Sequence, residues 1–118
     1  MNNTDLKMKV RTLMDKHCSA EGSVRPVDVL LDLAYLKEKD LNAFLSGHVP
    51  YLEKVCTTNL SKLKTIIDEM SAYAKERGYK ENTTVYKHKG KVLRFSKSGS
   101  PYIERKYSTH FISRSQLT

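Results

Sequence analysis

The chain has 118 residues and a formal net charge of +8, a length typical of one domain that can bury a hydrophobic core. It contains no run of ~20 apolar residues, and its first residues lack the apolar stretch of a secretion signal. We therefore expect a cytoplasmic protein without a membrane partner. Cys18 and Cys56 are expected to be free thiols, because structural disulfides are rare in that compartment.

A helical spacing of apolar residues, three and four apart, runs through most of residues 1–79. Pro26 suits the first position of a helix, because its missing N–H needs no partner there. Gly22, Gly47 and Gly78 can each adopt the left-handed conformation that ends a helix. The helices predicted from these signals cover residues 4–18, 25–36, 37–47, 50–56 (a short turn) and 59–78.

The pattern changes after Tyr79. Residues 83–88 and 91–96 are rich in β-branched and aromatic side chains, and Lys89–Gly90 joins them, so we predict a β-hairpin. Residues 101–112 fit both a helical and a strand spacing, and the sequence leaves their conformation open.

Together these elements predict the α+β class, with a helical core of four to five helices, a C-terminal β-hairpin and a short terminal element. We expect a single domain over residues 1–118. Within it, residues 1–79 form the helical core, residues 80–112 the basic hairpin region and residues 113–118 a frayed tail.

Nearly all the excess positive charge lies in the last third of the chain. Residues 80–118 hold nine Lys and Arg but only two Asp and Glu, whereas residues 1–79 hold 12 and 11. Such a patch attracts polyanions, and nucleic acid is the usual polyanion of the cytosol. Aromatic residues within this stretch argue against a disordered basic tail. The side chains expected to hold phosphates are those of Lys87, Lys89, Lys91, Arg94, Lys97 and Ser98.

Residues 27–60 resemble the helix-turn-helix of the Cro and phage-repressor type in their order of helix, turn, helix, glycine and proline. Leu41 occupies the buried position of the second helix, and Gly47 and Pro50 follow as they do in that family. The match departs in the turn, where Tyr35 stands at a position that usually holds glycine. The resemblance implies a duplex DNA ligand, a second helix in the major groove and a wing-like basic hairpin. The residues expected to face the bases are Lys37, Lys39 and Asn42.

The segments VPYLEKVC, NLSKL and LRFSKSG resemble parts of a set of small bacterial proteins known only as uncharacterised. That resemblance covers about residues 25–112. It implies a folded module and no particular activity, so charge and the helix-turn-helix pattern carry the functional prediction.

The main prediction is a non-enzymatic nucleic-acid-binding protein, with duplex DNA favoured and RNA left open. The alternative is a small phage or mobile-element protein that binds a nucleoprotein enzyme and inhibits or adapts it. The apolar face of residues 4–18 would also allow a homodimer.

A third hypothesis is a small nuclease or RNA-processing enzyme. Glu104, His110, Arg94 and Lys97 would supply its acid–base and phosphate-binding groups. A salt bridge from Glu104 to a neighbouring Lys or Arg explains this acid more simply. The four histidines and two cysteines lack metal-ligand spacing, and no glycine-rich nucleotide motif is present. We therefore expect no catalytic residue, metal or cofactor.

Overall fold

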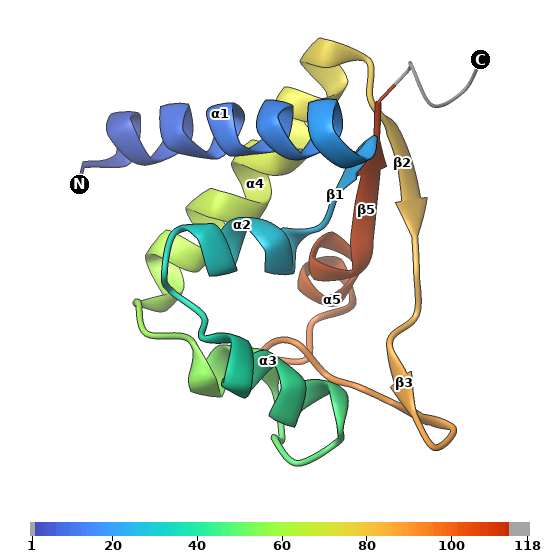
Figure 1. Ribbon diagram of the computed structural model, residues 1–118. Coiled ribbons are helices and arrows are strands. Elements are labelled where there is room, and N and C mark those ends of the chain that lie inside the picture. Colours follow the sequence, from blue (N-terminus) through green and yellow to red (C-terminus); the bar gives the residue numbers. More distant parts are fainter. Residues whose placement is uncertain (1, 114–118) are drawn as a thin grey trace.

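The computed structural model describes residues 2–113. Its helices are α1 (Asn3–Glu21), α2 (Pro26–Asp32), α3 (Glu38–Leu45), α4 (Leu60–Arg77) and α5 (Pro101–Ser108), with a 3₁₀ turn η1 (Leu52–Val55). Its strands are β1 (Ser23–Val24), β2 (Lys80–Thr83), β3 (Lys87–His88), β4 (Lys91–Val92) and β5 (Thr109–Ile112). The small sheet lies along one side of the helices (Figure 1), and the predicted α+β class is confirmed.

Local capping determines where the two long helices begin and end. The side chain of Asn2 accepts a hydrogen bond from the Asp5 N–H at 2.8 Å, and that of Asn59 accepts one from the Lys62 N–H at 2.8 Å. Gly22 and Gly78 end α1 and α4 in the left-handed conformation. Helix α1 therefore continues beyond residue 18, its predicted end, as far as Glu21, because Gly22 is the residue that ends the helix.

Helix α2 is shorter than predicted. It starts at Pro26 as expected but ends at Asp32, because Ala34 adopts a left-handed φ of 62°. The N–H of Ala34 donates to the carbonyl of Leu31 at 3.0 Å, and that of Tyr35 donates to Leu30 at 3.0 Å. The chain thus turns sharply after α2 although no glycine is present.

The strained turn after α2 gives a stability prediction. Ala34→Gly is expected to raise the free energy of unfolding by about 0.5 to 1 kcal/mol, because glycine adopts a positive φ without steric cost. The midpoint of urea unfolding measures the change. Ala72→Gly, at an exposed position within α4, is the control and should lower stability by about 1 kcal/mol. An equal loss of stability in Ala34→Gly and Ala72→Gly would contradict the left-handed conformation of Ala34.

The sheet joins segments that are far apart in the sequence. Strand β5 lies between β1 and β2 and is antiparallel to both. Residues 101–112, which fitted two patterns, adopt both: α5 runs to Ser108 and β5 begins at Thr109. Strand β1 was not predicted: it lies between the predicted helices at residues 4–18 and 25–36. The N–H of Ser113 adds a hydrogen bond to the Gly22 carbonyl at 2.9 Å.

The predicted hairpin is confirmed, with shorter strands. Lys87 pairs with Val92 and His88 with Lys91, and Lys89–Gly90 turns with φ values of 52° and 80°. The first half of predicted strand 83–88 is wrong, because Thr83 belongs to β2 and pairs with β5. Residues after β4 leave the hairpin and approach η1: the N–H of Glu53 donates to the Phe95 carbonyl at 2.9 Å.

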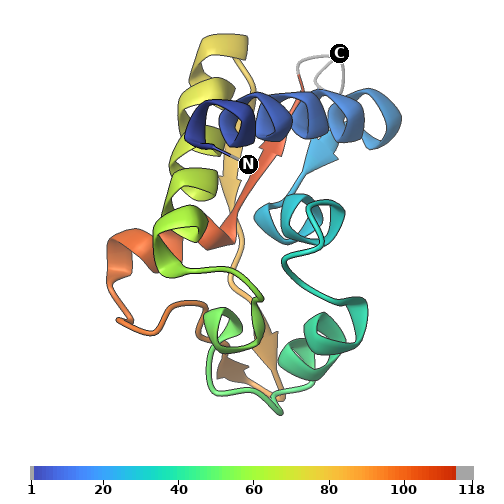
Figure 2. The same cartoon turned by 90° about the vertical axis from the view of Figure 1, so that its left-hand side faces the viewer.

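The core ties the hairpin region to the helices. Helix α1 packs across α4 at one end of the molecule, and α3 and the hairpin lie at the other end (Figure 2). At that end the Phe95 ring packs against Phe44 of α3 at 5.2 Å and stacks on Tyr107 of α5 at 5.5 Å. All three rings are buried, so the hairpin segment is fixed relative to α3 and α5.

Candidate nucleic-acid interface

A groove of about 830 Å³ lies between the hairpin and the loop that follows α3. Gly47 brings the two walls together: at its φ of 77° a Cβ atom would lie 3.2 Å from Cδ2 of His88. We name this the hairpin groove. Its lining residues are Gly47, His48, Val49, Pro50, His88, Lys89, Lys91, Val92, Leu93 and Arg94.

The hairpin groove is positively charged. Lys89, Lys91 and Arg94 are exposed, His48 and His88 add imidazole rings, and no carboxylate is among its lining residues. Within residues 2–113, every side-chain ion pair uses a cation outside the predicted phosphate-binding set. Within these residues, none of the predicted phosphate-binding cations is therefore paired with a carboxylate.

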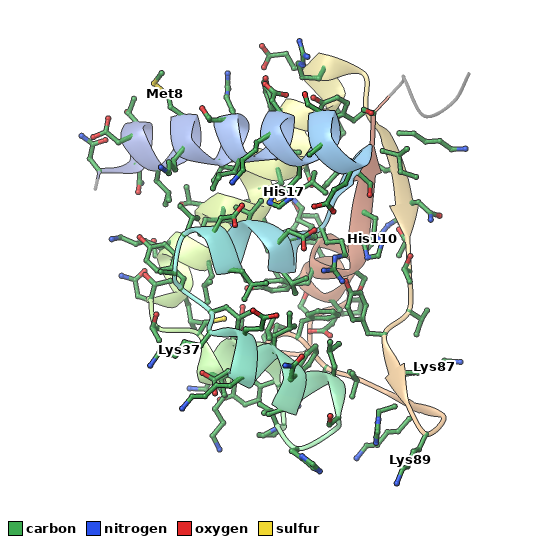
Figure 3. All side chains as sticks on the ribbon, viewed as in Figure 1. Met8, His17, Lys37, Lys87, Lys89 and His110 are labelled. Carbon is green, nitrogen blue, oxygen red and sulfur yellow. The ribbon has the colours of Figure 1, made fainter. Side chains whose placement is uncertain are left out.

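The predicted phosphate-binding cations differ in their contacts with the rest of the protein. The Arg94 guanidinium donates to the carbonyls of Ser96 (2.8 Å) and Lys97, and its Cζ lies 5.6 Å from the centroid of the Tyr51 ring. Arg94 therefore holds its own loop at one end of the groove. The Lys89 and Lys91 side chains are exposed and form no hydrogen bond or ion pair within residues 2–113. Lys87 and Lys89 project from the hairpin (Figure 3). The ammonium groups of Lys89 and Lys91 are therefore the most accessible hydrogen-bond donors for a phosphate group.

The loop at residues 96–100 is organised around carboxylates of the protein. Glu104 accepts hydrogen bonds from the backbone N–H groups of Phe95 (2.8 Å) and Ser96 (2.6 Å) and from the Ser96 hydroxyl. Glu53 accepts one from the Lys97 N–H at 2.8 Å. The backbone N–H groups of Phe95, Ser96 and Lys97 therefore already donate to carboxylates of the protein.

Ser98 completes this internal network. Its hydroxyl accepts a hydrogen bond from the Ser100 N–H at 3.2 Å, while the Ser96 hydroxyl accepts one from the Gly99 N–H at 3.0 Å. Ser98 is exposed, but its hydroxyl has a structural partner. Sequence reasoning missed Glu53 and Glu104 as organisers of this loop, since the two acids lie 51 positions apart.

The residues expected to face bases lie on the exposed surface of α3 and its N-cap. Lys37, Lys39 and Asn42 are all exposed. Lys37 lies at the end of α3 that is farther from the hairpin, whereas Lys87 and Lys89 lie beyond its other end (Figure 3). The predicted base-facing and phosphate-facing residues therefore line one end of the molecule without forming a compact cluster.

The proposed acid–base site is not assembled. The Glu104 carboxylate accepts hydrogen bonds from the backbone of residues 95 and 96. Among residues 2–113, no hydrogen bond or ion pair joins it to His110 or to a basic side chain. The salt bridge expected for Glu104 is therefore also wrong. His110 lies on β5 with its Nε2 at 2.9 Å from the Tyr86 hydroxyl. Within the same residues, no cluster of three or more His, Cys, Asp or Glu is arranged to hold a metal ion.

His110 gives a pH prediction. Burial lowers its pKa below the ordinary value of 6.5, the Arg25 charge lowers it further and Asp28 opposes the shift. As the pH falls, His110 therefore binds a proton at a higher pH in the unfolded chain than in the folded one. The free energy of unfolding that is present above about pH 6.5 thus declines as the pH falls below that value.

The variant His110→Gln is expected to reduce the loss of stability between about pH 7 and pH 5, measured as the urea midpoint at each pH. His48→Gln, at an exposed position, is the control. An unchanged pH dependence in His110→Gln, or the same reduction in both variants, would contradict this assignment.

None of the helices in residues 2–113 has the length and apolar character needed to cross a bilayer. Cys18 is buried and Cys56 half-buried, and both are free thiols.

Comparison of the sequence with protein-family models and with curated proteins, and of the structure with solved structures, returned no match. The functional conclusion therefore depends on the geometry and charge of the hairpin groove.

Proposed function

We propose that the protein binds nucleic acid without catalysing a reaction, and that the hairpin groove holds the phosphate backbone of duplex DNA. The single observation that carries this proposal is the acid-free groove of about 830 Å³ with Lys89 and Lys91 on its wall, two cations that make no ion pair within residues 2–113. A concave surface of one charge raises the local concentration of a polyanion. Free thiols suit a cytoplasmic protein.

The hairpin would position the protein, and α3 would read the sequence. Lys87, Lys89 and Lys91 would contact phosphates, which fix register but carry no base information. Lys39 and Asn42 are exposed on α3, and such side chains hydrogen-bond to guanine and adenine edges. Winged helix-turn-helix proteins also carry a basic hairpin after their helices; in this chain η1, α4 and β2 lie between α3 and the hairpin.

A salt series with a fluorescent duplex of ~20 bp tests the proposal. With three to four phosphate contacts, the logarithm of the association constant should fall against the logarithm of salt concentration with a slope of about −3 to −4. A single-stranded RNA of equal length is the comparison, and weaker binding of the RNA is expected. No binding of the duplex at about 50 mM salt would overturn the proposal.

A further inference from the structure

A second groove, of about 470 Å³, lies next to the hairpin groove. The segment from Leu93 to Ser98 contributes to both, its first residues to the hairpin groove and its last to this one. We name it the apolar groove. Its lining residues are Glu53, Leu60, Lys64, Ser96, Lys97, Ser98 and Ile103.

The apolar groove exposes a large hydrophobic side chain. Leu60 opens α4, where neither packing nor capping requires an apolar residue, and it is 52% exposed. Ile103 on α5 also lines the groove; it is half-buried and packs against the core. An apolar surface of this kind in a small concave site favours a ligand that brings its own apolar group.

The rim of the apolar groove is cationic. The side chain of Lys97 is exposed and makes no ion pair within residues 2–113. The ammonium group of Lys64 shares the Asp68 carboxylate with Lys106, at 2.6 and 2.7 Å, so two cations face one acid.

Glu53 is the acid that lines the groove, and its carboxylate offsets one of the two lysine charges of this rim. Its carboxylate accepts hydrogen bonds from the Lys97 N–H at 2.8 Å and the Tyr107 hydroxyl at 2.7 Å. Both donors are neutral groups of the protein, and the charged lining residues Glu53, Lys64 and Lys97 together leave a net charge of +1. The groove therefore combines an apolar floor with a positively charged edge.

We propose that the apolar groove docks a short acidic segment of a partner protein. One large apolar side chain of that segment would lie between Leu60 and Ile103, with carboxylates beside it facing Lys97 and Lys64. A nucleic-acid backbone matches the rim but not the apolar floor. A second copy of this chain is disfavoured because both copies carry a net charge of +8. This proposal is independent of the nucleic-acid function.

Selection from a random peptide display library, in the absence of nucleic acid, tests the proposal. The expected peptides carry a Leu, Phe or Trp flanked by Asp or Glu. A selected peptide, made synthetically with a fluorophore, should bind Leu60→Ser and Lys97→Glu at least tenfold more weakly than the unchanged protein. Selection of no binder, or of peptides without acidic residues, would overturn the proposal.

Matched controls separate this site from the rest of the surface. Val85→Ser removes another exposed apolar side chain (59% exposed), and Lys80→Glu reverses another exposed cation. Both should bind the peptide unchanged, as should the Lys89→Glu, Lys91→Glu double variant of the hairpin groove. Equal losses in Val85→Ser and Leu60→Ser, or a peptide displaced by duplex DNA in the double variant, would contradict docking in this groove.

Discussion

The double variant Lys89→Glu, Lys91→Glu is expected to bind a duplex of ~20 bp more weakly by a factor on the order of 10² to 10³ at about 50 mM salt. Each phosphate contact contributes roughly tenfold to the association constant at that salt concentration, and the new carboxylates repel the backbone in addition. The salt slope should become smaller by about 2, because two contacts are lost. Fluorescence anisotropy over a salt series measures both quantities.

A matched double variant on the opposite end of the molecule is the control. Lys7 and Lys9 are exposed on α1, which lies at the far end from the hairpin (Figure 2). Lys7→Glu, Lys9→Glu makes the same change in net charge and should retain the salt slope of the unchanged protein. If both double variants lose affinity equally, net charge rather than the hairpin groove determines binding, and the proposed interface is wrong.

Secondary structure was predictable where the signal is local. The caps of α4, Asn59 and Gly78, lie directly beside its apolar repeat, and Lys89–Gly90 carries the turn signal of a two-residue hairpin. Strand β1 has two residues, and its register depends on β5, which lies almost the whole chain away. No periodicity can be read in two residues, so the sheet could not be predicted.

The candidate site was predictable in composition but not in shape. The charge of Lys89 and Lys91 is visible in the sequence, whereas the groove depends on Gly47 packing against His88 across 41 positions. The sequence pattern also assigned Arg94 to phosphates. In the structure its guanidinium donates to two carbonyls of its own loop, a contact that depends on how the loop closes.

The variant Glu104→Gln is expected to lower the free energy of unfolding by about 2 to 3 kcal/mol. The carboxylate accepts hydrogen bonds from the N–H groups of Phe95 and Ser96 and from the Ser96 hydroxyl, and both residues are buried. An amide offers a single acceptor oxygen and turns an NH₂ donor toward the remaining N–H, which leaves a buried donor unpaired. In a chain of this length the melting temperature should fall by about 8 to 12 °C.

Glu81→Gln is the control, since Glu81 is the other acid of residues 80–118 and is exposed. Its melting temperature should stay within about 2 °C of the unchanged protein. The comparison also separates structure from catalysis. If Glu104 acted as a catalytic acid, the glutamine variant would keep its stability and lose cleavage of labelled RNA or DNA. Because the carboxylate holds residues 95 and 96, which directly follow Arg94 of the hairpin groove, we expect Glu104→Gln to weaken duplex binding together with stability.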